Sequence, residues 1–411
     1  MALFLSSKRL AGVSTDVREA PRPHGGAPGL AERSQGRCAP ACAARRRSIV
    51  LAPLLAAGAA AATALHVPHA AAAALEYEVD GATGLRRVKY TPEGWRYWSW
   101  RGRRVHYIEA GAANTGTPVV LVHGYGASAY HWRYQIPALE AAGHRVYAIC
   151  LLGFGYSEKA ITEYSGGGLW AEQLRDFIGD VVNGRGGGGG GEGAADNGGG
   201  GGAPERVVLA GNSLGGYASL VAAARHPELV AGLMLLNSAG PLKGDDEDDP
   251  SLDDAAASAS EPWYQPLADA AKRVVLFFAF QRARQPERIK EVLGMVYSND
   301  ASIDDDLVES IRVPATDPNA SEVFYRINTA KGTGTPPSVN ALFRKLRAAQ
   351  LPTLLLWGEQ DPWITSSRAD RLQRLYPEAV RVSLAAGHCP HDDAPAEASA
   401  AMVEWLRGLK A

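Results

Sequence analysis

Short runs of apolar residues, each bounded by glycine, proline or charged residues, recur along the chain from residue 104 onwards. A continuous apolar run of this length predicts a strand that is buried on both faces, as in a parallel sheet. The predicted strands are residues 104–109, 118–122, 145–151, 206–210, 231–236, 353–357 and 380–384. Segments with helical spacing lie between them, among them residues 170–182, 214–225 and 366–375. Because strands and helices alternate, the pattern predicts an α/β fold with a mostly parallel, doubly wound sheet.

Two segments interrupt this alternation. Residues 184–202 are almost entirely glycine, and such a segment loses too much backbone entropy on ordering to hold one shape. We expect a surface loop there. The second interruption, residues 241–351, opens with a run of aspartate and glutamate and continues with helical patterns at residues 263–284, 286–297 and 303–311. An insertion of this size between two core strands predicts a helical cap over the sheet.

The pattern near the N-terminus has a different character. Residues 1–74 are rich in arginine and alanine and poor in acidic residues, which is typical of an organelle transit peptide. Within them, residues 49–65 form an almost uninterrupted apolar run that resembles a second, signal-like element. A transmembrane anchor is the alternative, although a span requires ~20 clearly apolar residues. We therefore expect a leader over residues 1–74, a mature protein that begins between Ala70 and Glu76, and a folded domain over residues 75–411.

Composition narrows the functional classes. The formal net charge is −2 and the basic residues form no clustered stripe, so we expect no nucleic-acid partner. Of the four cysteines, only Cys150 and Cys389 lie outside the leader, which is too few for a disulfide framework. No glycine-rich phosphate-binding pattern runs from a strand directly into a helix. We expect neither a metal nor an organic cofactor.

The clearest chemical signal is the segment GNSLGG at residues 211–216, which follows a predicted strand and opens a predicted helix. A serine on such a strand–turn–helix bend has a strained backbone, so its neighbours two residues away must be small. The bend lifts the hydroxyl above the sheet edge, beside the positive N-terminus of the helix. Ser213 is therefore the predicted nucleophile.

A serine hydroxyl becomes an effective nucleophile when a base takes its proton and a carboxylate orients that base. His388 follows the last predicted strand, and Asp361 follows the strand before it. The chain order serine, aspartate, histidine is one in which such triads occur. His388 is thus the predicted general base and Asp361 the orienting acid. His391 and Glu359 are the alternatives for these two roles.

Acyl transfer also requires two N–H donors for the negatively charged oxygen. One predicted donor is the backbone N–H of Leu214, directly after the nucleophile. The other is the backbone N–H of Tyr125, in the loop HGYG that follows the strand at residues 118–122. We interpret His123 in this loop as a structural, hydrogen-bonded residue. All these residues follow strand ends, and ligands of open α/β sheets bind at that edge.

With these motifs in place, residues 98–409 resemble the α/β-hydrolases of plant and algal plastids, and among them the pheophytinase and chlorophyll dephytylase relatives. The motifs that carry the resemblance are residues 123–126, 151–157, 211–216, 314–320, 357–363 and 387–392. The resemblance implies the α/β-hydrolase fold with an inserted cap, a Ser213–His388–Asp361 triad and a chloroplast location. It also implies a hydrophobic carboxylic ester as substrate, because characterised members release phytol from chlorophyll-type pigments.

Two features depart from the family pattern. Many relatives have aspartate where Cys150 stands; that residue supports a loop and is not catalytic, so the departure bears on stability rather than on mechanism. The glycine-rich segment is also foreign to the pattern, although it lies away from the motifs.

Other activities are compatible with parts of this pattern. Epoxide hydrolases and dehalogenases use a carboxylate nucleophile where Ser213 stands, which argues against them. Hydrolysis of a carbon–carbon bond can use the same triad and stays open as an alternative. A ligand receptor built on a hydrolase scaffold would also keep the same residues.

One apolar segment of the predicted cap has no polar face. Residues 274–280 read VVLFFAF, whereas helices at a protein surface usually have a polar side. One interpretation is that one face packs on the sheet domain and the rest on neighbouring cap helices. The other is that part of this surface lines a pocket for an acyl or prenyl chain, or docks on a membrane such as the thylakoid, where such esters reside.

Overall fold

The computed structural model describes residues 75–164, 167–184, 204–243, 265–329 and 336–409. The predicted leader, most of the glycine-rich segment and the acidic run that opens the predicted cap lie outside the described residues. By its internal contacts the chain divides into residues 1–70 and residues 71–411, and every described residue belongs to the second unit.

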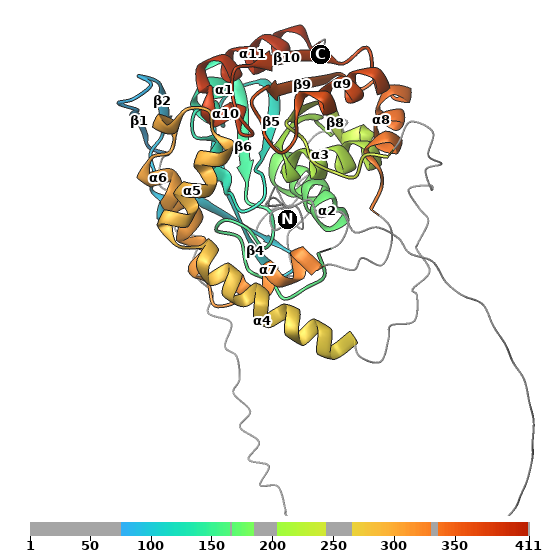
Figure 1. Ribbon diagram of the computed structural model, residues 1–411. Helices are drawn as coiled ribbons and strands as arrows, with labels where there is room; N and C mark the ends of the chain where they lie inside the picture. Colours follow the sequence, from blue (N-terminus) through green and yellow to red (C-terminus); the bar gives the residue numbers. More distant parts are fainter. Residues whose placement is uncertain (1–74, 165–166, 185–203, 244–264, 330–335, 410–411) are drawn as a thin grey trace, which may run out of the picture. The chain divides into compact units, whose positions relative to one another are not determined.

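An eight-stranded sheet forms the centre of this unit (Figure 1). Its strand order is β10-β9-β8-β7-β5-β6-β4-β3, and all neighbouring strands are parallel except the pairs β3–β4 and β4–β6. The strands are β3 (Arg96–Trp100), β4 (Arg103–Ala110), β5 (Gly116–Val122), β6 (His144–Ile149), β7 (Val207–Asn212), β8 (Val230–Leu236), β9 (Thr353–Gly358) and β10 (Val380–Leu384). The predicted fold class, a mostly parallel α/β sheet, is confirmed.

The seven predicted strands are all present, and β3 is an addition that the pattern did not predict. β3 joins β4 through the two residues Arg101 and Gly102, whose φ angles are 50° and 74°. Two positive φ angles are the geometry that matches the twist of a β-hairpin. A separate hairpin of β1 (Tyr77–Val79) and β2 (Arg86–Val88) was also not predicted.

Helices cover both faces of the sheet, so that the strands bury side chains in two cores. In β7, Val207 and Leu209 point into one core while Val208 and Ala210 point into the other, as the two-residue repeat of a strand requires. The first core is covered by α2 (Gly168–Phe177), α3 (Leu214–Arg225), α8 (Val339–Ala348) and α9 (Ser366–Leu375). The second is covered by α1 (Gln135–Ala141) and α11 (Pro395–Gly408).

The predicted cap segment lies between β8 and β9 and is helical. Its described helices are α4 (Gln265–Ala283), α5 (Pro286–Val296), α6 (Asp305–Arg312), α7 (Ala320–Thr329) and α8. In Figure 1, α4, α5, α6 and α7 gather at one side of the sheet, apart from α8. α8 packs against α3 and α9 and buries Leu342 and Phe343 in the first core. Within the predicted cap segment, α8 thus belongs to the helix layer over the first core.

The apolar segment of the cap forms the middle of α4. Phe280 packs on Phe324 of α7, with ring centroids 5.1 Å apart. Val274, Val275, Phe277 and Phe278 are exposed. The interpretation that one face packs on the sheet domain and the rest on neighbouring cap helices is therefore wrong for these four side chains. Within the part of the chain that the structure describes, no helix is both long and apolar enough to cross a bilayer.

Candidate active site

Ser213 occupies a sharp turn between the end of β7 and the start of α3. Its φ and ψ are 52° and −116°, a region that side chains with a Cβ rarely adopt. The turn brings backbone segments very close together: a Cβ at Gly215 would lie 2.3 Å from the carbonyl oxygen of Val122, and a Cβ at Gly211 would lie 2.4 Å from that of Gly215. Only glycine fits at either position, which is the geometry expected of a nucleophile elbow.

Asp361 and His388 meet beside this turn. Asp361 follows β9, His388 follows β10, and His388 Nδ1 lies 2.6 Å from Asp361 Oδ2. Both residues are buried. The structure therefore brings together the two predicted partners, which are 27 positions apart in the sequence.

The Asp361 carboxylate has further donors that hold it in place. Its Oδ1 atom accepts hydrogen bonds from the backbone N–H groups of Trp363 (2.8 Å) and Ile364 (3.0 Å). Burial acts to raise the pKa of Asp361, but the hydrogen bond and charge of His388, together with these two N–H groups, outweigh it and lower the pKa below its ordinary value. The carboxylate stays ionised and available to orient the imidazole.

Asn237, which the sequence analysis missed, completes this environment. Its Nδ2 donates to Asp361 Oδ2 (2.8 Å), and its Oδ1 accepts from the Gly358 N–H (2.8 Å). Asn237 directly follows β8 and has a φ of 41°. The signal that located Asp361 and His388, a polar residue just after a buried strand, was present here as well.

Asn212 and Gly124 connect the turn that carries Ser213 with two other parts of the site, the His388 backbone and the loop after β5. Asn212 Nδ2 donates to the carbonyl oxygen of His388 (2.9 Å), so the residue before the predicted nucleophile contacts the predicted base. A Cβ at Gly124 would lie 3.4 Å from Ser213 Cβ, which places the loop after β5 against the serine. Among the hydrogen bonds of the described residues, none joins Ser213 Oγ to His388. Such bonds are often long without substrate and tighten when it binds.

The two predicted oxyanion donors belong to the start of α3 and to the loop after β5. Leu214 begins α3, where the first N–H groups of a helix have no acceptor within the helix. The Tyr125 N–H donates no hydrogen bond within the described part of the chain. The Tyr125 side chain is held from the cap, because Asn328 Nδ2 of α7 donates to its hydroxyl oxygen (2.6 Å).

His123 and Cys150 are held by hydrogen bonds to the backbone of neighbouring segments. His123 Nδ1 lies 2.7 Å from the carbonyl oxygen of Gly124, and its Nε2 accepts from the N–H of Leu151 (3.0 Å). Both ring nitrogens are engaged, as the structural interpretation of His123 expects. Cys150 Sγ accepts from the Ala129 N–H (3.3 Å), and burial raises the pKa of its thiol to about 11. A neutral Cys150 thiol that contacts the backbone at Ala129 agrees with a supporting, non-catalytic role for residue 150.

The alternative acid and base lie in different settings. Glu359 is exposed. His391 is fully buried between aromatic rings, with centroids 4.2 Å from Trp132 and 4.7 Å from His131. Neither of its ring nitrogens has a hydrogen-bond partner in the described structure. The geometry therefore favours His388 and Asp361 over these alternatives.

A buried ion cluster ties the His388 loop to the cap. Arg133 Nε donates to Asp392 Oδ1 (2.8 Å), and both side chains are fully buried. Arg133 Nη1 also donates to Asp304 Oδ2 (2.7 Å), and Asp304 caps the N-terminus of α6. Tyr297 donates to Asp392 Oδ2 (2.9 Å). We call Arg133, Asp304, Tyr297 and Asp392 the Arg133 cluster.

The cap also contacts the His388 loop through its backbone. The His388 N–H donates to the carbonyl oxygen of Val296 at the end of α5 (2.8 Å). Asp393 Oδ2 accepts from the N–H groups of Gly387 (2.6 Å) and Ser298 (2.9 Å). The segment between α5 and α6 is thus part of the support of the predicted base.

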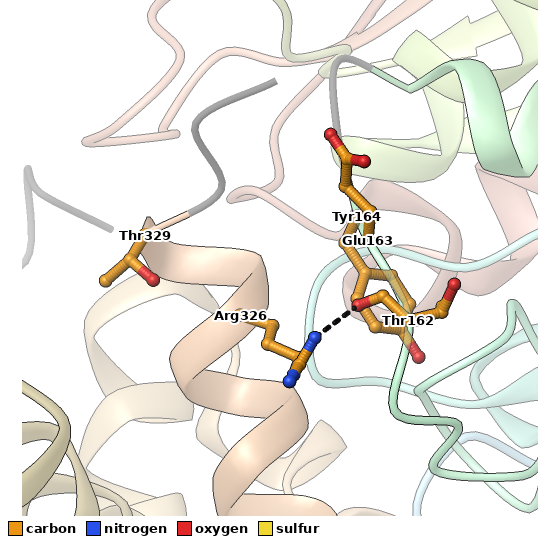
Figure 2. Close-up of a pocket in the computed structure, with 5 residues that line it drawn as sticks. All are labelled: Thr162, Glu163, Tyr164, Arg326 and Thr329. Carbon is orange, nitrogen blue, oxygen red and sulfur yellow. Dashed lines mark hydrogen bonds between the residues drawn. The ribbon is translucent and has the colours of Figure 1, made fainter. Parts of the chain in front are cut away.

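A surface pocket of about 310 Å³ lies between residues 162–164 and α7 (Figure 2). Arg326 and Thr329 of α7 form its other wall, and Arg326 Nη1 donates to the carbonyl oxygen of Thr162 (3.3 Å). None of the five lining residues belongs to the predicted triad. α7 also carries Asn328, which contacts Tyr125. Among the described residues, no group of three or more histidine, cysteine or acidic side chains is arranged to hold a metal ion.

A strained serine between a parallel strand and a helix, with a histidine–aspartate pair at neighbouring strand ends, is typical of α/β enzymes that carry a nucleophile elbow. Residues 119–401 match the model of the alpha/beta hydrolase family. The chain belongs to this family.

Several relatives illustrate the range of the family. Pheophytinase, chloroplastic, from Arabidopsis thaliana is 29% identical over 340 residues, which cover 75% of this chain and 65% of that protein. The chain thus spans just under two thirds of the pheophytinase's length, and the predicted resemblance to the pheophytinase-like group is confirmed. Epoxide hydrolase 3 from Xenopus tropicalis is 26% identical over 361 residues, which cover 82% of this chain and 81% of that protein.

A shorter match and two solved structures complete the comparison. The 2-hydroxy-6-oxo-6-(2'-aminophenyl)hexa-2,4-dienoic acid hydrolase of Metapseudomonas resinovorans is 37% identical over 142 residues, 34% of this chain and 40% of that protein. A thermophilic esterase from Thermogutta terrifontis has a TM-score of 0.53 at 22% identity, covering 77% of this chain and 99% of the esterase. The CarC serine hydrolase of carbazole degradation has a TM-score of 0.54 at 23% identity, covering 76% and 98%. At these identities the structures bear on the fold alone.

Proposed function

We propose that this protein is a serine hydrolase that cleaves a hydrophobic carboxylic ester with Ser213, His388 and Asp361. The supporting observation is the 2.6 Å contact between His388 Nδ1 and Asp361 Oδ2 at the edge of the sheet where β7 presents the strained Ser213. Because an ionised Asp361 accepts the proton on Nδ1, the lone pair of His388 lies on Nε2, which is the tautomer that a base requires.

In the proposed mechanism, Ser213 Oγ attacks the ester carbonyl carbon while His388 Nε2 takes the hydroxyl proton. The Tyr125 and Leu214 N–H groups donate to the oxygen that becomes negative. His388 then returns the proton to the departing alcohol as its bond to the carbonyl carbon breaks. Water, activated by the same histidine, hydrolyses the acyl-enzyme and restores Ser213.

The substrate we propose is an ester with a long apolar portion, for instance a phytyl ester of a chlorophyll-type pigment, hydrolysed in the chloroplast. The similarity to the chloroplastic pheophytinase supports this, as does the arginine-rich leader. An apolar surface also lies beside the predicted base: Trp363, 42% exposed, has its ring centroid 5.4 Å from that of His388. By the same reasoning the thylakoid membrane is the proposed source of the substrate.

Hydrolysis of a carbon–carbon bond is the second candidate. The similarity to a dienoic acid hydrolase supports it, and the same triad would serve both reactions. Epoxide opening is a weaker candidate despite the similarity to epoxide hydrolase 3, because a serine stands at the position of the carboxylate nucleophile.

A fluorophosphonate probe on the purified protein tests the nucleophile. We expect labelling of the unaltered protein, no labelling of Ser213→Ala, and a kcat lower by on the order of 10³ or more in the variant. Equal labelling of both proteins would show that the nucleophile is a different residue. Labelling without multiple turnover on any ester would favour a ligand receptor. Competition of a plastid lipid and pigment extract against the probe would then narrow the substrate.

A series of p-nitrophenyl esters tests the substrate class. We expect kcat/KM to rise with acyl chain length, because each buried methylene adds about 0.8 kcal/mol of binding. A preference for the acetate over long chains would contradict a hydrophobic ester, and with it the pigment ester, while leaving the triad intact.

A further inference from the structure

Helix α4 has one face that packs on the protein and one that does not. Asp269, Arg273, Leu276 and Phe280 recur at helical spacing, so they share a face. This face meets α7: Arg273 Nε lies 2.9 Å from Glu322 Oε2, its guanidinium lies 4.3 Å from the centre of the Tyr325 ring, and Phe280 contacts Phe324. In Figure 1, α4 runs along the outer edge of the described domain with α7 beside it.

The opposite face of α4 is apolar and exposed. Ala271, Val275 and Phe278 recur at the same spacing and are all exposed, with Val274 next to them and Arg282 one turn further along. The exposed fractions are 56% for Val274, 63% for Val275 and 66% for Phe278. Burying these three side chains in an apolar phase would be favourable, because it removes their apolar surface from water.

Exposed cations flank this face and can meet an anionic lipid surface. Residues 265–290 contain six lysine and arginine residues against Asp269 and Glu287. Four of the six also pair with acidic side chains, Lys272 with Asp269, Arg273 with Glu322, Arg288 with Glu291 and Lys290 with Asp305, and exposed pairs of this kind are weak. Lys272 and Arg282 are exposed on either side of the apolar residues. Apolar side chains flanked by cations are the chemistry of helices that lie in the plane of a membrane interface.

The size of the face argues against a second protein chain as its main partner. α4 has 19 residues, so it is about 28 Å long and about 10 Å wide. A face of about 300 Å² is well below the ~800 Å² that each partner buries in a stable protein interface. A lipid bilayer imposes no such minimum, because the inserted side chains bind a fluid apolar phase.

We propose that α4 docks on an anionic lipid bilayer. Val274, Val275 and Phe278 insert among the acyl chains, and Lys272 and Arg282 lie at the headgroups. α4 is joined through α7 to the predicted active site, since Asn328 of α7 donates to the hydroxyl of Tyr125. Docking would thus place the cap side of the protein on the membrane that holds an apolar ester. The docking itself does not depend on the proposed chemistry.

Cosedimentation with vesicles tests the proposal, with Ser213→Ala as the background so that turnover plays no part. The vesicles are phosphatidylcholine alone or mixed with phosphatidylglycerol. We expect the full chain to bind the mixed vesicles more tightly and added salt to weaken that binding. Val275→Asp combined with Phe278→Asp should weaken it at least ~10-fold, because two apolar side chains are lost from the membrane. Val79→Asp is the matched control, since Val79 is 71% exposed on β1.

The experiment also needs a signal from α4 itself, because residues 49–65 of the same chain are apolar and are a second segment that can bind vesicles. Phe278→Cys, in a chain with Cys38→Ser and Cys42→Ser, can carry an environment-sensitive fluorophore. We expect its emission to shift to shorter wavelength with mixed vesicles, and the emission from the same label at Val79→Cys to stay unchanged. An unshifted label at position 278 overturns the proposal.

Sedimentation velocity without vesicles tests the competing occupant. We expect the protein and its Phe278→Asp variant to sediment alike. A dimer that Phe278→Asp dissociates would overturn the lipid proposal and assign the face to a second copy of the chain. Retention of p-nitrophenyl acetate hydrolysis by Val275→Asp and Phe278→Asp in the Ser213 protein shows that the variants are folded.

Discussion

At the residue scale, the environment of Asp361 separates it from an ordinary buried carboxylate. A buried carboxyl group without donors would take up a proton and lose its charge. Asp361 instead accepts from His388, Asn237 and two backbone N–H groups, and its pKa is lowered. The charge that orients His388 is therefore present throughout the neutral range.

Replacing Asp361 by asparagine tests this role. An amide in that position can donate to His388 Nδ1 and so favour the tautomer that carries its proton on Nε2, which cannot act as a base. We expect Asp361→Asn to lower kcat by roughly 10⁴ with little change in KM, measured on a soluble ester. Glu359→Gln is the control and should retain activity. The opposite result would assign the acid to Glu359.

The buried histidines predict how the free energy of unfolding depends on pH. Burial, with help from nearby cations, lowers the pKa of His106 and His131 to about 3, that of His123 to about 4 and that of His391 well below its ordinary value. In the unfolded chain these imidazoles take up protons near pH 6.5. The unfolded state then binds more protons than the folded state, so the free energy of unfolding is highest above pH 6.5 and falls as the pH drops toward 4.

His391→Asn measures one part of this effect, because asparagine does not titrate. Urea unfolding between about pH 7 and pH 5 should show a smaller loss of stability in the variant, by up to about 1.4 kcal/mol per pH unit. The groups that face His391 are His131 and Trp132, with Arg133 and His388 near it. Esterase activity at pH 7 should persist in His391→Asn and be lost in His388→Ala. An unchanged slope would mean that His391 takes up its proton over the same pH range in the folded and unfolded states, which would contradict a lowered pKa.

At the scale of secondary-structure elements, the Arg133 cluster joins three parts of the chain. Arg133 precedes α1, Asp392 lies in α10 (Pro390–Asp393), and Asp304 caps α6 of the cap segment. Breaking a buried ion pair costs more than the pair itself contributes, because the remaining charge is left without a partner. The cluster thus fixes the start of the cap's α6 against the loop that carries His388.

Arg133→Leu leaves the fully buried Asp392 without its cation, whereas Asp304 is partly exposed and keeps its pair with Arg87. We expect the free energy of unfolding to fall by about 3–5 kcal/mol, measured by urea titration. Arg407→Leu removes an arginine from an exposed pair with Glu404, and it should leave stability unchanged within error. Equal effects of the two substitutions would contradict a special role for the buried cluster.

At the scale of the whole molecule, the glycine-rich segment is closed at its base by the described domain. Asn183 Nδ2 donates to the carbonyl oxygen of Glu205 (3.2 Å), and the Glu205 N–H donates to Asn183 Oδ1 (3.2 Å). These two residues hold the ends of the segment side by side whatever its length. The length of a flexible loop changes its closure entropy by only about 0.6 kcal/mol per doubling.

Deleting residues 186–201 should therefore leave both the Tm and the esterase activity nearly unchanged. Thermal unfolding and p-nitrophenyl ester assays of the shortened protein provide the measurement. Asn183→Ala in the full chain is the companion variant, which tests the closing pair alone. A large loss of Tm or activity on deletion would show that the glycine-rich segment itself contacts the domain.

Residues whose surroundings are set by neighbours along the chain could be predicted from the sequence. Five of the seven predicted strands were visible as apolar runs, because a strand buried on both faces carries few polar side chains, whereas β4 and β10 were visible by alternating polar and apolar residues. Ser213 was visible because the elbow requires glycine on both sides within six residues. β3 was not visible, since its five residues, RYWSW, form neither a continuous apolar run nor a regular alternation.

Pairings between distant residues were decided only by the tertiary structure. The sequence placed Asp361 and His388 after successive strands, and the parallel order of β8, β9 and β10 brought them together with Asn237. Arg133 and Asp392 are 259 positions apart, and nothing local marks them as partners. The exposure of Val275 and Phe278 was also decided by the tertiary structure. An apolar run along the chain predicts that a helix is buried. Which face of α4 is buried depends on the neighbours that pack against it.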